Sequence, residues 1–288
     1  MTQKRLAYLG PAGTFSEEAA ISYDPNAERV VFPSIPQVTL AIESGAVTEA
    51  IVPIENSQQG SIPDVLDFLI RTERTKICHE MALAINNCLM IRPGTDLSSI
   101  QIIYSHPQPL GQCRRYLASH FPEVKLIAAL STAGAVRDMM QSDVPAAAVA
   151  PARSAEIYGA EVVARGIQDR PNNFTRFVVL SDHDHDPTGE DKTSIAFSFD
   201  KDGPGLLYAA LGAFATRNVN LTKIESRPSG EQLGRYIFLA DIEGHRADTV
   251  IVEALNALRG IASNLKIFGS YPRSIRVPPK NAEKPAAT

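Results

Sequence analysis

The sequence predicts an α/β protein in which two α/β lobes are followed by a ferredoxin-like βαββαβ unit. Short apolar runs alternate with amphipathic helical patterns from residue 5 to residue 181, which is typical of parallel sheets with crossover helices. A charged stretch at 182–191, which contains proline and glycine, separates a second pattern of strands and helices from the first. One long alternating stretch near residue 77 divides the first pattern into two lobes.

Length, composition and charge exclude several classes of protein. The 288 residues suffice for two domains or three, and 44% apolar with 21% charged residues is ordinary for a globular chain. The net charge of -4 gives no basic field, so we expect no nucleic-acid partner. No apolar run approaches a membrane span and no hydrophobic leader is visible, so we expect neither membrane association nor a signal peptide.

The cysteines and the charged linker bear on metals and compartment. Cys78, Cys88 and Cys113 lie far apart without a CxxC spacing, which indicates a reducing, cytoplasmic location and small buried apolar side chains. The linker 182–191 holds two histidines, four aspartates and one glutamate, but nothing in it enforces ligand geometry. We therefore expect a solvated linker and no metal site.

The first lobe is expected to cover about residues 1–76 and 170–181. Thr14 and Glu17 form a capping box at the start of its first helix, and Ser34 and Gln37 begin the second, which ends before Gly45. The expected strands are 5–9, 30–32 and 50–54, and the expected helices are 14–22, 34–44 and 62–72, with a polar loop at 55–61.

The second lobe is expected at about 80–168. Apolar residues alternate from Ile77 to Ile91, which is too long for one ordinary strand and predicts a ribbon between the lobes. The expected strands are 102–104, 125–130, 146–150 and 161–164, and the helices are 109–119, 132–140 and 151–158. Strand 177–180 returns to the first lobe, so the chain crosses twice and forms a hinged cleft, where open α/β sheets bind ligands.

The segment after the linker, residues 192–275, reads as a βαββαβ unit. Its expected strands are 193–199, 220–226, 236–242 and 265–269, and its helices are 206–217 and 248–258. The remaining tail, 276–288, is rich in proline, lysine and alanine, and we expect it to be disordered.

A polar segment at 166–177 places several donors at the entrance of an apolar strand. Asn172 and Asn173 offer amides, and Thr175 and Arg176 offer a hydroxyl beside a guanidinium. Because arginine binds carboxylates through a planar fork, this segment suits an anionic, oxygen-rich small molecule. The alternative is a turn with an Asx cap and a surface arginine.

Four other loops place small donors directly after a predicted strand. They are 10–14, Glu55-Asn56-Ser57, Ser105-His106 and Ser131-Thr132. The first lacks the lysine of a phosphate loop and is not GxGxxG, so nucleotide binding is not expected. Each loop alone fits a helix cap, whereas four facing one cleft would form a binding site. Ser105 and His106 are neighbours in sequence and are expected to point apart, so they do not form a nucleophile–base pair. His106 is therefore expected to have a structural or substrate-orienting role.

In this order the motifs resemble the prephenate dehydratase family, and the unit after the linker resembles its ACT regulatory domain. The resemblance spans residues 5–275 and implies a two-lobed, periplasmic-binding-protein-like catalytic domain at 1–181 and an ACT domain at 192–275. No chorismate mutase pattern precedes Leu6, so the monofunctional form is expected. The matching motifs are Gly10-Pro11-Ala12-Gly13-Thr14-Phe15-Ser16, Pro53-Ile54-Glu55-Asn56-Ser57 with Gly60, Ser105-His106-Pro107-Gln108, Ser131-Thr132, Asn173-Phe174-Thr175-Arg176-Phe177, Asn220-Leu221-Thr222-Lys223-Ile224 and Glu225-Ser226-Arg227-Pro228.

The resemblance implies a carbon–oxygen lyase that converts prephenate to phenylpyruvate in L-phenylalanine biosynthesis, by loss of water and carbon dioxide. Aromatisation drives this reaction, so no cofactor is expected. Thr175 would assist the departing hydroxyl, while Arg176 would bind a carboxylate or order the loop. The implied substrate-binding residues are Thr14, Asn56, Ser57, Ser105, Thr132, Asn173 and Phe177.

The resemblance also implies feedback regulation by L-phenylalanine, bound between the ACT units of two chains in a homodimer or homotetramer. Leu206 stands where the family usually has alanine, and its larger side chain is expected to narrow the effector pocket. The implied effector residues are Gly205, Leu206, Leu207, Glu225, Ser226 and Arg227. Two alternatives stay open, an arogenate dehydratase and a non-catalytic small-molecule-binding sensor.

Overall fold

The computed structural model describes residues 4–200, 203–230, 234–274 and 276–277. Its chain divides into two compact units. The first consists of Met1–Ile62, Met81–Phe177 and Arg276–Thr288, and the second of Pro63–Glu80 and Val178–Ile275. The domain boundaries expected from the sequence differ from this division, because residues 63–80 are grouped with the C-terminal part of the chain.

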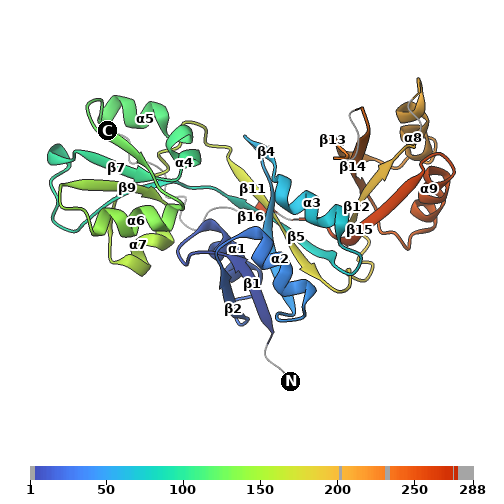
Figure 1. Ribbon diagram of the computed structural model, residues 1–288, viewed down its shortest axis with the longest axis horizontal. Helices are drawn as coiled ribbons and strands as arrows, with labels where there is room; N and C mark the ends of the chain where they lie inside the picture. Colours follow the sequence, from blue (N-terminus) through green and yellow to red (C-terminus); the bar gives the residue numbers. More distant parts are fainter. Residues whose placement is uncertain (1–3, 201–202, 231–233, 275, 278–288) are drawn as a thin grey trace. The chain divides into compact units, whose positions relative to one another are not determined.

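One sheet has seven strands in the order β16-β5-β11-β3-β1-β2, with β4 paired to β3 (Figure 1). β1 pairs in parallel with both β2 and β3, and helices α1 (Phe15–Tyr23) and α2 (Ile35–Glu43) contact β1 and β3. As predicted, the strand near 177–180 returns to this sheet. The strands are β1 (Arg5–Leu9), β2 (Glu28–Phe32), β3 (Glu49–Asn56), β4 (Gly60–Ser61), β5 (Lys76–Ala84), β11 (Phe174–Ser181) and β16 (Arg276–Val277).

A second sheet, of five strands, lies wholly in the first unit and has the order β10-β6-β9-β7-β8. Its strands are β6 (Cys88–Ile91), β7 (Ile102–Ser105), β8 (Lys125–Ala128), β9 (Ala146–Ala150) and β10 (Glu161–Arg165). The accompanying helices are the 3-10 helix η1 (Leu97–Ser99), α4 (Pro107–Gln112), α5 (Arg114–His120), α6 (Thr132–Met140) and α7 (Ala152–Tyr158).

Helices cover both faces of this second sheet, as Figure 1 shows. Because side chains alternate along a strand, β6 sends Cys88 and Met90 into the core formed with α6 and α7. Leu89 and Ile91 point the other way, into the core formed with α4 and α5. The strand is therefore buried on both faces, which explains why its sequence is continuously apolar.

The structure corrects several expected elements. The stretch 77–91 is two strands, β5 and β6, which belong to different sheets, so it carries the chain between the lobes as two strands rather than one ribbon. The helix expected at 109–119 is broken at Cys113, whose φ of -107° and ψ of 15° are not helical, into α4 and α5. Thr175 and Arg176 lie inside β11, because that strand begins at Phe174 rather than at 177.

The expected disordered tail is wrong for its first two residues. Arg276 pairs in parallel with Ala82 of β5, and Val277 pairs with Leu83. Residues 278–288 of the expected tail lie outside the described residues.

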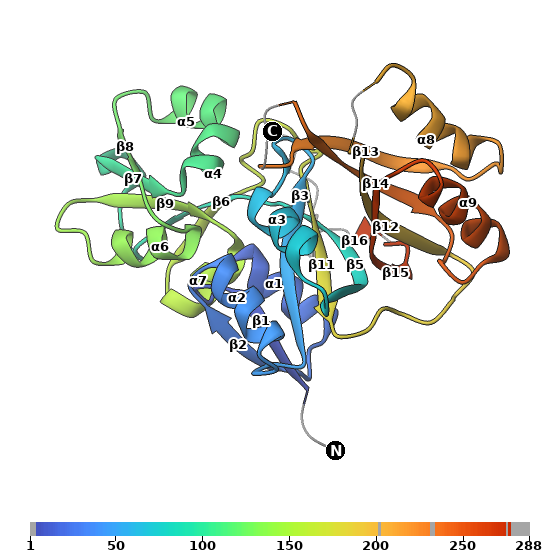
Figure 2. The same ribbon diagram turned by 45° about the vertical axis from the view of Figure 1, so that its right-hand side comes forward.

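The rest of the second unit contains the predicted βαββαβ order, with the antiparallel sheet β13-β14-β12-β15. The hydrophobic core between this sheet and its two helices includes Ile195, Phe197, Phe214, Ile242 and Leu255. Figure 2 shows α8 and α9 on the same side of the sheet. The elements are β12 (Asp191–Ser198), α8 (Leu206–Ala215), β13 (Leu221–Pro228), β14 (Tyr236–Glu243), α9 (Thr249–Arg259) and β15 (Asn264–Pro272).

The sheet also holds α3 (Pro63–Arg71), which belongs to the same unit. Leu265 and Ile267 of β15 pack into the core with α8 and α9, so Lys266 between them points to the opposite face. Its ammonium donates to the carbonyl of Ile70 at 2.8 Å and to that of Thr72. This contact joins the C-terminal end of α3 to the sheet β13-β14-β12-β15.

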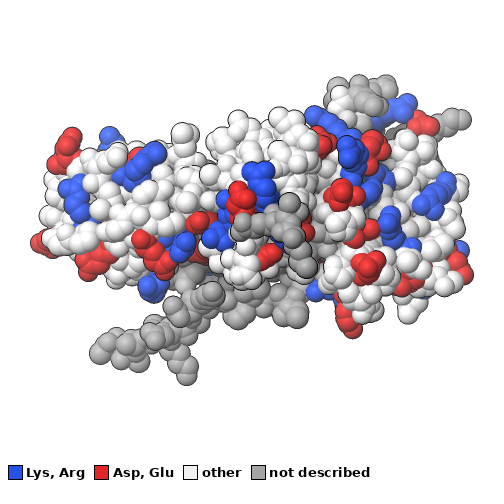
Figure 3. All heavy atoms as spheres, turned by 90° about the horizontal axis from the view of Figure 1, so that it is seen from below, with Lys and Arg blue, Asp and Glu red and all other residues white. Residues whose placement is uncertain are grey.

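None of the helices within the described residues is long and apolar enough to cross a membrane. Among the described residues, no group of three or more His, Cys, Asp and Glu side chains could hold a metal ion. On the face drawn in Figure 3, Lys and Arg are interspersed with Asp and Glu, and neither sign forms a continuous field.

A close backbone approach makes Gly269 of β15 sensitive to substitution. Its φ is +152°, and an added Cβ would lie 2.1 Å from the carbonyl oxygen of Ile77. Gly269→Ala should therefore cost more than the roughly 1–3 kcal/mol of ordinary overpacking and lower the Tm measured by calorimetry. Gly212→Ala is the control, because its Cβ meets nothing within 4 Å and it gains helix propensity of about 1 kcal/mol. A Gly269→Ala protein with the Tm of the wild type would contradict the close approach of Gly269 to Ile77.

Candidate active site

A cavity of about 260 Å³ lies within the first unit, and we call it the Thr175 cavity. Its walls come from the ends of β1, β3 and the segment after β7, from the start of β11, and from the first turns of α1, α4 and α6. The described lining residues include no Asp, Glu, Lys or Arg. Any anion bound here would be held by neutral donors and backbone dipoles.

Three helices begin at this cavity. Thr14 is the N-cap of α1, His106 of α4 and Ser131 of α6, and each side chain accepts a backbone N–H of its own helix. All three residues line the Thr175 cavity. Because the N-terminus of a helix carries a partial positive charge and N–H groups without intrahelical acceptors, α1 and α6 favour an anion between them.

The side-chain amide of Asn56 joins the end of β3 to the start of β11. Its Nδ2 lies 3.0 Å from Oδ1 of Asn173 and 3.0 Å from Oγ1 of Thr175. Its Oδ1 accepts the backbone N–H groups of Gln58 at 3.0 Å and Gln59 at 3.2 Å. One buried amide thus fixes both the loop after β3 and the hydroxyl at the cavity wall.

The hydroxyl of Thr175 is oriented by this network. Because its oxygen accepts a hydrogen from Asn56, its own hydrogen is available for donation into the cavity. The side chain is 9% exposed and lines the cavity together with Phe177. Arg176 alternates to the other face of the strand, where its Nη1 lies 3.7 Å from Oε2 of Glu55, and it does not line the cavity. Of the two roles expected for Arg176, this geometry favours ordering the loop.

The structure does not bring all the expected substrate residues to the cavity. Thr14, Asn56, Thr132, Thr175 and Phe177 line it.

Ser57, Ser105 and Asn173 do not line the Thr175 cavity. The hydroxyl of Ser57 accepts the backbone N–H of Phe174 at 3.0 Å. Ser105 is fully buried and donates to the carbonyl of Val149 at 2.6 Å. Asn173 is fully buried behind Asn56. The two serine side chains therefore hold backbone near the cavity, and Asn173 holds the side chain of Asn56.

His106 faces the cavity as a neutral imidazole. Burial lowers its pKa below the ordinary value of 6.5. Its Nδ1 accepts the backbone N–H of Gln108 at 3.3 Å, so the proton of the neutral ring resides on Nε2. His106 can therefore donate a hydrogen bond without carrying charge.

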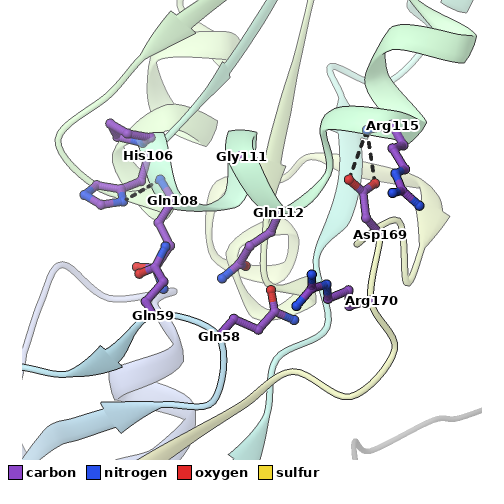
Figure 4. A pocket seen from close by; sticks show the side chains of 10 residues that line it. Gln58, Gln59, His106, Gln108, Gly111, Gln112, Arg115, Asp169 and Arg170 are labelled. Carbon is purple, nitrogen blue, oxygen red and sulfur yellow. Dashed lines mark hydrogen bonds between the residues drawn. The ribbon is translucent and has the colours of Figure 1, made fainter.

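A larger cavity of about 710 Å³, which we call the Arg170 cavity, adjoins the first and shares His106, Gln108 and Gln112 with it (Figure 4). Sequence reasoning missed Gln112, because a glutamine within an expected helix carries no signal that separates a cavity wall from a solvated face. Its position follows from the break of that helix at Cys113.

The expected effector residues lie in the second unit. Gly205 begins α8 with a φ of +85°, and Leu207 and Tyr208 after it are 36% and 83% exposed. On the edge strand β13, Glu225 lies 3.4 Å from the ammonium of Lys223. Exposed apolar side chains and an edge strand in the same unit indicate a surface suited to a partner.

Arg227 of β13 is bound to α3. Its Nη2 lies 2.8 Å from Oδ1 of Asp67, and its Nη1 donates to the carbonyl of Pro63 at 3.2 Å. The guanidinium of Arg227 thus binds the first turns of α3 through one carboxylate and one backbone carbonyl. In sequence that helix follows β3, which ends at Asn56, the short loop after it and β4.

The fold and the site are those of an α/β enzyme whose cavity suits a small anion and whose C-terminal part is a ferredoxin-like βαββαβ unit. Comparison with protein families agrees: residues 6–185 match the model described as prephenate dehydratase, and residues 201–260 match the ACT domain. The chain belongs to the prephenate dehydratase family, whose reaction is of the lyase type.

Curated and solved relatives cover nearly the whole chain. A prephenate dehydratase of Mycobacterium sp. (strain JLS) is 37% identical in an alignment of 282 positions that covers 93% of this chain and 89% of the relative. Arogenate dehydratase/prephenate dehydratase 1 of Arabidopsis thaliana is 38% identical over 94% of this chain and 72% of the relative. The solved prephenate dehydratase of Arthrobacter aurescens in complex with L-Phe has a TM-score of 0.85 and 33% identity, and the match covers 93% of this chain and 90% of the solved one.

The lowered pKa of His106 predicts a pH effect on stability. Above the unfolded pKa of about 6.5 neither state binds the proton, and the cap of α4 contributes fully. As the pH falls through the folded pKa, the unfolded state has already gained a proton that the folded state resists, and stability is lost. The Tm of the wild type should therefore fall relative to that of His106→Asn, which caps without titrating, between about pH 7.5 and pH 5.5. If the Tm values of the wild type and of His106→Asn changed in parallel with pH, the lowered pKa of His106 would be contradicted.

Proposed function

We propose that the Thr175 cavity is the place where this chain converts prephenate into phenylpyruvate, water and carbon dioxide. The observation that carries the proposal is the Thr175 hydroxyl, which Asn56 turns so that its hydrogen faces a cavity at the N-termini of α1 and α6. Such a cavity suits a ring that carries a carboxylate on one carbon and a hydroxyl on the opposite carbon, the two groups that prephenate must lose.

For this reaction the protein must position the substrate ring and assist the departure of its hydroxyl. The ring carboxylate leaves as carbon dioxide, and the electron pair of the broken C–C bond passes through the ring. That pair expels the hydroxyl on the opposite ring carbon, which becomes water when it receives a proton. Aromatisation supplies the driving force, so the protein must hold the ring in line and stabilise the leaving oxygen.

We assign roles to residues that line the cavity. Thr175 donates its hydrogen bond to the departing hydroxyl, which gains charge in the transition state. Thr14 and Thr132 hold the ring carboxylate at the starts of α1 and α6. Phe177, which is almost fully buried, packs against the ring. Asn56 keeps the Thr175 hydroxyl oriented, and a threonine acts here through electrostatic stabilisation because its pKa is too high for it to be a strong acid.

The test is an assay of the full chain with prephenate, in which phenylpyruvate formation is followed by ultraviolet absorbance. A chain that binds prephenate without forming phenylpyruvate would be a sensor rather than an enzyme. The same assay with arogenate measures the alternative substrate.

Thr175→Ala should lower kcat about 10²–10³-fold with a much smaller change in KM, because the lost hydrogen bond strengthens in the transition state. Thr175→Ser is the matched control, since it keeps the hydroxyl and should retain most of kcat. Steady-state kinetics of both variants decide the point. A near-wild-type kcat for Thr175→Ala would remove this hydroxyl from the chemistry.

Regulation is proposed to act through the second unit of two copies of the chain. L-Phenylalanine would bind at the start of α8 and along β13, at Gly205–Leu207 and Glu225–Arg227. The position of β13 at the edge of its sheet and the exposed Leu207, Tyr208 and Ile224 support an interface there, and so a homodimer or homotetramer. The Arthrobacter aurescens relative contains L-Phe. A cytoplasmic location suits the three free, buried cysteines.

The contact of Arg227 with α3 supplies a route to the active site. An effector carboxylate near β13 would compete with Asp67 for the guanidinium of Arg227. Because only the short strand β4 lies between the loop after Asn56 and α3, a shift of the first turn of α3 would change that loop. Phenylalanine would then lower activity by favouring one state of the loop.

Gly205→Ala should weaken phenylalanine binding by the full chain at least about 10-fold in calorimetry, because the αL turn at the start of α8 is strained by about 1–2 kcal/mol with a Cβ. Gly189→Ala is matched, since Gly189 also has a positive φ and open space around its Cβ, but it lies in the linker. Equal affinities of both variants, or a wild type without binding at millimolar phenylalanine, would refute the proposed effector site.

A further inference from the structure

Two amide groups that line the Arg170 cavity carry hydrogens that no described group accepts. The Nε2 atoms of Gln58 and Gln112 are buried and have no hydrogen-bond partner among the described atoms. Gln112 is 9% exposed and lines both the Thr175 cavity and the Arg170 cavity. Since a buried N–H without an acceptor is costly, the two amides indicate a position for ligand oxygens.

The orientation of the Gln112 amide is fixed by its neighbours. Its Oε1 accepts a hydrogen from Nδ2 of Asn87 at 3.2 Å. The backbone carbonyl of Gln112 accepts the N–H of Asp169 at 2.7 Å, which holds the residue in place. Nε2 is therefore the atom that faces the cavities.

A guanidinium enters the same space. Arg170 follows Asp169 in the loop before β11, and Figure 4 shows its side chain converging with those of Gln58 and Gln112. Asp169 supplies the one carboxylate among the described residues that line the Arg170 cavity. Both of its oxygens accept the backbone N–H of Arg115 at 3.1 Å, so it caps α5. The Arg170 cavity thus presents hydrogen-bond donors and positive charge to a ligand.

We infer that Gln112, Gln58 and Arg170 form the subsite for the three-carbon side chain of the substrate and select a keto group over an amino group in it. This rests on the proposed function, which places the ring hydroxyl at Thr175. The side chain sits on the opposite ring carbon, and from there it extends past Gln112 into the Arg170 cavity. Its keto oxygen accepts from Nε2 of Gln112, and its carboxylate meets the guanidinium of Arg170.

The donors explain the selection. Prephenate and arogenate differ in this side chain alone, as a ketone and an ammonium. An ammonium only donates hydrogen bonds, so in this subsite it would face the two amide N–H groups and the guanidinium. The one carboxylate among the described lining residues, Asp169, is already bound to the backbone N–H of Arg115. A site built to donate to a keto oxygen rejects the analogue that lacks it.

The experiment measures kcat and KM of the full chain with prephenate and with arogenate. Gln112→Glu keeps the size of the side chain and an oxygen that accepts from Asn87. It replaces the N–H donor that faces the substrate with a carboxylate oxygen, which can only accept. It should raise KM for prephenate about 100-fold, hold kcat within about threefold, and lower the prephenate-to-arogenate ratio of kcat/KM by about 100-fold. Gln101→Glu adds the same charge at an exposed position outside both cavities and should leave these values unchanged.

A second variant guards against a folding defect. Arg170 is exposed, so Arg170→Gln should fold as the wild type does and raise KM for prephenate about 10-fold. If the wild type dehydrates neither substrate, the proposed function fails and the subsite with it. If the wild type is active and both variants keep its KM and substrate ratio, the subsite alone is overturned. If Gln112→Glu does not fold, the KM of Arg170→Gln decides.

Discussion

The active site depends on one buried side-chain amide. Asn56 bonds to Asn173 and Thr175 on one side and to the backbone of its own loop on the other. These groups are more than a hundred positions apart in sequence, so the amide sets the distance between the end of β3 and the start of β11. A buried amide bonded at both ends is costly to disturb, which makes it a rigid support for the Thr175 hydroxyl.

The distribution of charge around the site suits a substrate that must lose one carboxylate and keep another. The described wall of the Thr175 cavity has no charged side chain, so the departing carboxylate would meet neutral hydroxyls and helix N-termini. The arginines lie in the adjoining cavity, toward the carboxylate that stays on the product. A full cation on the departing group would stabilise the ground state more than the transition state and so slow the reaction.

Much of the fold could be predicted because apolar periodicity reports burial directly, and the strands of both sheets and of the βαββαβ unit follow it. Thr14, Asn56 and Thr132 follow predicted strands, so one sheet edge could be expected to gather them, whereas their roles and that of Thr175 were implied by the family resemblance. Arg176 was harder, since its direction depends on where β11 begins. Gln112 and the strand Arg276–Val277 carry no local signal, because their places are set by tertiary contacts.

The chain interleaves its two units, and this limits how they can be separated. Residues 63–80 lie before β6 in sequence but pack with the C-terminal unit, where Ile77 meets Gly269 and the polypeptide between Asp67 and Thr72 meets Arg227 and Lys266. Cutting after residue 181 would strip α3 and half of β5 of these neighbours and uncover apolar surface. A feedback-insensitive enzyme is therefore reached by single substitutions rather than by removing the regulatory half.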